Sequence, residues 1–158
     1  MAGRPTVVLV HGFPDNSAVW DGVADLLAER FHVVRYDVRG TGGSGAPDGR
    51  DGYRLDQLAA DLVAVVQAVS PGRPVHLVAH DWGSLQGWHA VTEPDYAPLF
   101  ASYTSISGPC VDHIDAWTRR QIRRLRFGSV LRQLLHSWYS GLPSRAQRDQ
   151  AQPSRLHG

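Results

Sequence analysis

The chain has 158 residues and contains no lysine, a single cysteine and no long hydrophobic run. The lone cysteine, Cys110, excludes an internal disulfide and fits a reducing compartment. The apolar stretch near the N-terminus, residues 7–10, is far shorter than a membrane span or the core of a signal peptide. We therefore expect an unprocessed protein of a bacterial cytoplasm, without a transmembrane segment.

An excess of charge of one sign is also lacking. All 16 basic residues are arginine, which indicates a GC-rich genome, and the net charge is only +1. Such a balance creates no overall field that would attract nucleic acid. We therefore expect no nucleic-acid partner.

The signatures of bound metals and nucleotides are absent as well. His, Cys and carboxylate residues do not occur at metal-ligand spacing. The glycines of residues 40–45 are followed by no lysine, and the dinucleotide fingerprint GxGxxG does not occur. The sequence therefore predicts no metal and no cofactor.

Short apolar runs alternate with helical patterns as far as Ile106. Runs of β-branched and apolar residues predict strands, and apolar residues at three- and four-residue spacing predict helices. The predicted strands are residues 6–10, 31–36, 75–79 and 100–106, and the predicted helices are residues 17–30, 55–69 and 82–92. This alternation indicates the α/β class, with a parallel, doubly wound sheet that binds ligands at the carboxyl ends of its strands.

The pattern changes after residue 111. Two helices are predicted, at residues 112–126 and 129–139, and the first of them is crowded with arginines. The arginines indicate a solvated helix face, and the alternative is contact with an anionic lipid or an acidic partner. Residues 141–158 have very little apolar content, so we expect a disordered tail.

The most informative segment is Ala79-His80-Asp81-Trp82-Gly83, which joins a predicted strand to a predicted helix. A strained turn of this kind needs small residues two positions before and after the reactive residue, and Ala79 and Gly83 supply them. Asp is common in plain turns and at helix N-termini, but this context favours Asp81 as a nucleophile. Its carboxylate can displace a group at an sp3 carbon and form an alkyl ester.

Three motifs follow one another at the carboxyl ends of predicted strands. They are His11-Gly12-Phe13-Pro14, Tyr36-Asp37-Val38-Arg39-Gly40-Thr41-Gly42-Gly43-Ser44 and His80-Asp81-Trp82-Gly83. Together they resemble the α/β-hydrolase fold over residues 5–141, and an elbow Asp followed by Trp resembles the epoxide hydrolases and haloalkane dehalogenases. Phe13 favours the epoxide hydrolases, because dehalogenases usually carry a halide-binding Asn at that place.

The resemblance implies a role for each residue of these motifs. The backbone N–H groups of Phe13 and Trp82 would form an oxyanion hole, and Asp81 would attack the substrate, a small hydrophobic epoxide or alkyl halide. Tyr139 resembles the cap tyrosine that donates a proton to the opening epoxide. The residues expected to support the motifs are His11, Gly12, Pro14, His80 and Gly83.

In the family, a catalytic acid and a catalytic histidine follow the nucleophile, and neither finds a match in this sequence. We therefore expect an incomplete α/β-hydrolase, with its core at residues 1–111, the start of a helical cap at 112–140 and the tail at 141–158. Residues from about 142 onward would be translated out of frame or belong to a truncated gene. Such a chain would complete at most the first half-reaction.

Three alternatives stay open. The chain could be similar to haloalkane dehalogenases, or be a non-catalytic relict that binds small molecules, or fail to fold alone because an apolar edge strand is exposed. The stretch of residues 105–113 also resembles the hydrolase half of actinobacterial proteins in which such a domain is fused to a short-chain dehydrogenase.

Overall fold

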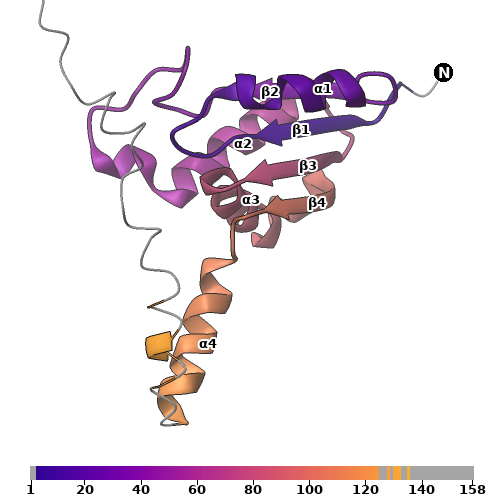
Figure 1. The fold of residues 1–158 in the computed structure, drawn as a ribbon. Coiled ribbons are helices and arrows are strands. Elements are labelled where there is room, and N and C mark those ends of the chain that lie inside the picture. Colours follow the sequence, from indigo (N-terminus) through magenta and orange to yellow (C-terminus); the bar gives the residue numbers. More distant parts are fainter. Residues whose placement is uncertain (1–2, 125–127, 129, 133–134, 136–158) are drawn as a thin grey trace, which may run out of the picture. The chain divides into compact units, whose positions relative to one another are not determined.

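A computed structural model of the chain describes residues 3–124, 128, 130–132 and 135 (Figure 1). The strands are β1 (Thr6–Val10), β2 (His32–Tyr36), β3 (Val75–His80) and β4 (Phe100–Ile106). The α-helices are α1 (Asp21–Leu27), α2 (Leu55–Val69), α3 (Trp82–Thr92) and α4 (Val111–Arg123). Short 3-10 helices are η1 (Ser17–Trp20), η2 (Arg50–Tyr53) and η3 (Ala97–Leu99). The chain divides into two compact units, residues 1–110 and 111–158.

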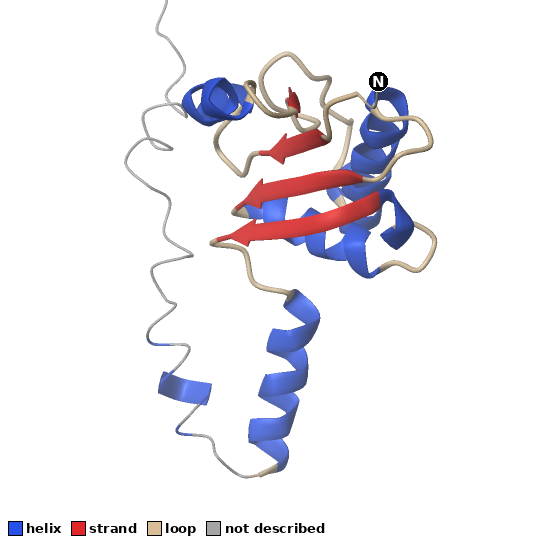
Figure 2. Ribbon diagram, turned by 90° about the vertical axis from the view of Figure 1, so that its right-hand side faces the viewer, coloured by secondary structure: helices blue, strands red, loops and turns tan. Residues whose placement is uncertain are grey.

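The first unit is built on a sheet of four strands in the order β2-β1-β3-β4. Every pairing is parallel, so the strands end at one edge of the sheet, as their arrows show in Figure 2. Parallel strands need helical crossovers, and these are α1, α2 and α3. The predicted α/β class with a parallel sheet is confirmed.

Helices α2 and α3 cover one face of this sheet. The strand residues Val8, Val10 and Leu77 are completely buried on that face, and α2 packs Leu62 and Val66 against them. Burial of each such side chain stabilises the fold by about 1.5–3 kcal/mol. This apolar layer fixes the ends of β1 and β3 relative to the first turn of α3.

The opposite face of β1 is covered by η1 and α1. Trp20, at the end of η1, is buried in a cluster with Val7 and Leu9. Asn16 starts this segment, because its side-chain oxygen accepts the Ala18 N–H at 2.9 Å. The sheet is therefore covered on both faces, as the alternation of strands and helices predicts.

Several boundaries differ from those predicted by the sequence. One helix was expected over residues 17–30, but the Asn16 cap produces η1 first, and α1 begins only at Asp21. Strand β2 begins one residue later than expected, and β3 continues to His80. The helices expected at residues 55–69 and 82–92 coincide with α2 and α3.

The second unit contains α4. It begins one residue earlier than expected and ends at Arg123, and Arg119 pairs with Asp115 one turn before it at 2.7 Å. Most of the helix expected at residues 129–139 and all of the tail at 141–158 lie outside the described residues. Among the helices of the described part of the chain, none has both the length and the apolar character required to cross a membrane.

Candidate active site

Asp81 lies at the turn between β3 and α3, at the carboxyl edge of the sheet. Its backbone has φ 51° and ψ −122°, a conformation that non-glycine residues rarely adopt. The turn is held by backbone hydrogen bonds from Asp81 N–H to Ile106 O and from Ser84 N–H to Asp81 O, both 2.9 Å long, and by a longer one from Leu85 N–H to Asp81 O. A strained residue held in this way presents its side chain at a fixed place above the sheet.

Two glycines allow the turn to sit close to the loop after β1. A Cβ on Gly83 would lie 2.7 Å from the carbonyl oxygen of Val10, and a Cβ on Gly12 would lie 2.6 Å from an Asp81 carboxylate oxygen. Real Cβ atoms do not approach other atoms so closely, so any larger residue would push the turn and the loop apart. Ala79, two residues before Asp81, is completely buried.

The Asp81 carboxylate accepts a hydrogen bond from the Phe13 N–H at 3.3 Å. Among the described residues, this is the only hydrogen bond to that carboxylate. The Trp82 N–H donates none to it. The side chains of Phe13 and of Trp82, the residue after Asp81, are 60% and 56% exposed. These two rings are aromatic surfaces that a hydrophobic molecule can contact.

His11 is buried at the start of the loop that carries Phe13. Its Nε2 accepts the Val38 N–H at 3.0 Å, which requires Nε2 to be unprotonated. The proton is therefore on Nδ1, which donates to the Gly12 carbonyl at 2.8 Å. This neutral imidazole joins the loops after β1 and β2. His11 therefore holds the loop that positions Phe13 and is not free to act as a base.

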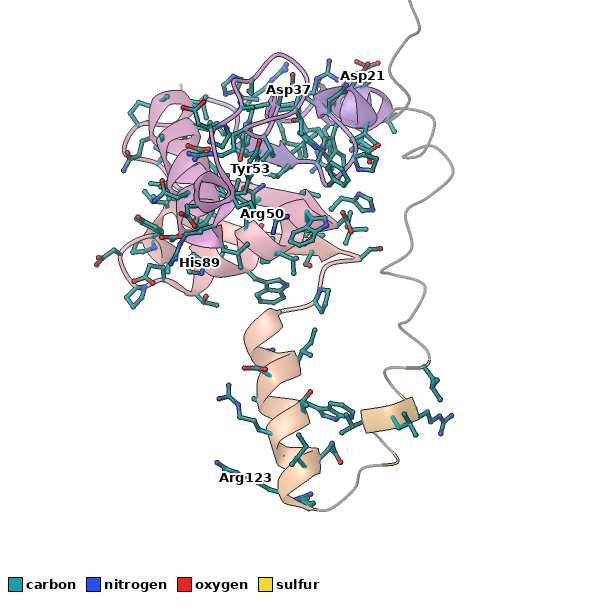
Figure 3. The ribbon with its side chains drawn as sticks, turned by 90° about the vertical axis from the view of Figure 1, so that its left-hand side faces the viewer. Asp21, Asp37, Arg50, Tyr53, His89 and Arg123 are labelled. Carbon is teal, nitrogen blue, oxygen red and sulfur yellow. The ribbon has the colours of Figure 1, made fainter. Side chains whose placement is uncertain are left out.

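Asp37 fastens the second of these loops, and the sequence pattern gave it no separate role. Its carboxylate accepts the Ser17 and Gly43 N–H groups at 2.8 Å each. Hydrogen bonds from Ser17 and then from the Gly43 backbone lower the pKa of Asp37 to about 2. Figure 3 shows Asp37 in the loop after β2.

Arg39 in the same loop forms a bidentate pair with Asp61 of α2, with both N–O distances at 2.6 Å.

Two polar residues of α3 were also missed from sequence. Ser84 is completely buried, and its hydroxyl donates to the Ala79 carbonyl at 2.7 Å, which ties the first turn of α3 to the end of β3. Gln86 is 1% exposed. Nothing in the local pattern distinguishes these two from surface residues of a helix, because their partners and neighbours come from other elements.

A cavity of about 520 Å³ opens beside Phe13 and Trp82. It is enclosed by the loops after β1 and β2, by Tyr53 and Leu58, and by the first turns of α3. Asp81 does not line it, but its neighbours Trp82 and Gly83 do. Its size suits a small molecule.

The remaining residues predicted for the site are His80, Pro14 and Tyr139. His80 is the last residue of β3, and Pro14 follows a cis peptide bond from Phe13. Tyr139 lies outside the described residues. In the described part of the chain, no group of three or more His, Cys, Asp or Glu side chains is arranged to hold a metal ion.

Comparison with known proteins agrees with this geometry. The model of the α/β hydrolase fold family matches residues 5–138. The probable oxidoreductase EphD of Mycobacterium tuberculosis is 50% identical over 120 residues, which make up 76% of this chain and 20% of that protein. Epoxide hydrolase A of the same species is 33% identical over 141 residues, or 89% of this chain and 42% of that protein. The chain thus spans less than half the length of these two relatives.

The solved structures include a variant epoxide hydrolase from Bacillus megaterium in complex with its diol product. It superposes on this chain with a TM-score of 0.63 at 31% sequence identity. The match covers 68% of this chain and 37% of that one. The similarity therefore extends over about two thirds of this chain and little more than a third of the larger enzyme.

Proposed function

This chain belongs to the α/β-hydrolase fold family and is similar to its epoxide hydrolases, and we propose that its Asp81 attacks small hydrophobic epoxides. The proposal is supported above all by the strained turn that holds the Asp81 carboxylate beside the Phe13 N–H. A carboxylate is a suitable nucleophile for an sp3 carbon. The exposed Phe13 and Trp82 rings offer an apolar surface for the substrate.

The reaction would begin with attack of an Asp81 carboxylate oxygen on one epoxide carbon. A new C–O bond forms the alkyl ester, the ring C–O bond breaks, and the departing oxygen takes both electrons and then a proton. We propose Tyr139 as the proton donor, by resemblance to the cap tyrosine of the family. The Phe13 N–H would orient the attacking carboxylate and later stabilise negative charge on the ester oxygen.

Release of the diol would require water to attack this ester with the help of a base. In the part of the chain that the structure describes, no histidine forms a hydrogen bond with the Asp81 carboxylate. His11, the nearest in sequence to Phe13, is fully engaged by Val38 and Gly12. We therefore expect the alkyl ester to form and to persist. We also propose that residues 1–111 are the hydrolase core, residues 112–140 the start of a cap and residues 141–158 the tail.

Intact-protein mass spectrometry tests this proposal. Incubation with 1,2-epoxyhexane should add the mass of one epoxide to the wild-type chain and none to Asp81→Asn. The matched control is Asp95→Asn, which removes an exposed carboxylate just after α3 and should leave the adduct unchanged. Equal labelling of all three proteins would contradict the proposal, because it would indicate unspecific alkylation.

The alternatives give different results in the same experiment. A chain similar to haloalkane dehalogenases would release halide from 1-chlorohexane and form the ester with the alkyl group alone. A non-catalytic binding protein would bind both compounds reversibly and show no change in mass.

A further inference from the structure

Another cavity, of about 420 Å³, lies at the edge of the sheet where the strands begin. Its walls come from the segment before β1, from the start of β2, and from the end of α2 with the loop that follows it. These segments are neighbours because β1 pairs in parallel with both β2 and β3. In Figure 1 the arrowheads of the strands point away from this edge, and Asp81 follows the opposite end of β3. The cavity is therefore separate from the candidate active site.

The charged side chains of this cavity are all basic. Arg4, His32 and Arg73 line it, and each of them is exposed, so a molecule from solvent can reach them. Among the described residues that line the cavity, none is Asp or Glu. Neither arginine forms an ion pair with any residue in the described part of the chain. Two unpaired guanidinium groups at one cavity favour an anion as the ligand.

Backbone contacts hold the two guanidinium groups in place. Arg73 Nη2 donates to the Arg4 carbonyl at 3.1 Å, and a Cβ on Gly3 would lie 3.5 Å from Arg73 Nη1. Arg4 Nη1 donates to the Ala28 carbonyl at 2.7 Å. Each contact uses one nitrogen of its guanidinium and leaves most of the N–H donors for a ligand. Because the side chains are already anchored, they lose less freedom when a ligand binds.

The end of α2 opposes an anion, but only weakly. Val69 is the last residue of α2 and Ser70 is its cap, and both line the cavity. The free carbonyl groups at the C-terminus of a helix are equivalent to roughly half a negative charge. The Ser70 hydroxyl donates to the Arg73 carbonyl at 3.0 Å. Two full positive charges outweigh the partial charge of the helix, so the balance in the cavity still favours an anion.

We propose that this cavity binds the phosphate or diphosphate group of a small molecule, through the guanidinium groups of Arg4 and Arg73. The planar fork of an arginine matches pairs of phosphate oxygens, and its charge-assisted hydrogen bonds are stronger than neutral ones. Val69 and Pro71 offer an apolar surface to the rest of the ligand. The site does not depend on the reaction proposed for Asp81.

Pyrophosphate is the probe that tests the proposal. The full chain, labelled with nitrogen-15, is titrated with pyrophosphate and, separately, with sodium chloride to the same ionic strength. Pyrophosphate should shift the backbone amide resonances of Thr6, His32 and Arg73 until they saturate, and it should leave those of Trp82 and Gly83 unchanged. Shifts that match those caused by sodium chloride would overturn the proposal.

Substitutions separate a specific site from attraction by net charge. Arg4→Gln and Arg73→Gln, which lie in different segments, should each weaken pyrophosphate binding by about tenfold. The matched control is Arg50→Gln, which removes the same charge from an exposed arginine of η2 and should keep the wild-type affinity. Arg73→Lys keeps the charge without the paired donors and should bind several-fold more weakly than the wild type. Equal affinities in Arg4→Gln, Arg73→Gln and Arg50→Gln would overturn the inference.

Discussion

Gly12 lies so close to Asp81 that a Cβ at Gly12 would come within 2.6 Å of the Asp81 carboxylate. The loop after β1 and the turn after β3 are thus in direct contact through a glycine that has no side chain to separate them. This contact allows the next residue, Phe13, to donate its N–H to the same carboxylate at 3.3 Å. The placement of the Asp81 carboxylate therefore depends on the loop as much as on its own turn.

Gly12→Ala should damage the site more than the fold. The added methyl group must push the Asp81 carboxylate away from the Phe13 N–H, so ester formation should slow by about a hundredfold. Overpacking should lower the free energy of unfolding by about 1–3 kcal/mol, measured by urea denaturation. Gly22→Ala is the control, because nothing lies within 4 Å of its Cβ position in α1, and it should raise stability by about 0.5–1 kcal/mol. Unchanged ester formation in Gly12→Ala would contradict the close contact.

His11→Phe should destabilise the first unit by about 2–3 kcal/mol, because the part-buried Val38 N–H and the buried Gly12 carbonyl lose their partners. Chemical denaturation measures this change. His89→Phe, in the last turn of α3, has no such pair of loop contacts and should cost less. If the two variants are equally stable, His11 does not join the two loops.

Asp37 should make the fold sensitive to acid. Its pKa is lowered to about 2 in the folded chain, whereas an unfolded Asp titrates near 3.8. The unfolded state therefore takes up a proton first as the pH falls. The stabilisation, about 1 kcal/mol after solvent screening, is fully present above about pH 4 and is lost as the pH falls toward 2.

Thermal unfolding between pH 2 and 7 measures this effect of Asp37. Asp37→Asn should be less stable at pH 7, and its stability should depend less on pH in the acid range. Asp48→Asn, an exposed residue of the same loop, should follow the wild-type curve. A wild-type acid dependence in Asp37→Asn would show that other carboxylates are responsible.

Gln86→Leu should stabilise the chain. Leucine has a similar volume and leaves no unpaired amide oxygen in the interior, so the free energy of unfolding should rise by about 1 kcal/mol. Differential scanning calorimetry checks this rise. A loss of stability would indicate that the Gln86 amide already has a partner inside the protein.

The sequence predicted those features that depend on neighbours along the chain. Alternation and helical spacing locate the four strands, and α2 and α3 have the predicted bounds. The turn at Asp81 is also a local feature, since Ala79 and Gly83 mark the strand-to-helix junction. Helix α1 was predicted too long because the pattern did not reveal that the Asn16 cap begins a 3-10 helix.

Features that depend on distant residues could not be predicted. His11 meets Val38 across 27 positions, and Asp37 meets Ser17 across 20. Their side chains look like ordinary motif residues until the loops are brought together. Gln86 gives no signal at all, because a glutamine at this position of a helix is compatible with a solvent-facing surface, and only the packing of α3 buries it.

We propose that the Asp81 carboxylate is the nucleophile, and locating the alkyl ester in the sequence tests this. The wild-type chain is treated with 1,2-epoxyhexane and digested at acid pH, and its peptides are fragmented by tandem mass spectrometry. If Asp81 is the nucleophile, the fragment ions that contain Asp81 carry one added epoxide mass. An adduct spread over exposed carboxylates, or a fully unmodified Asp81 peptide, would contradict it.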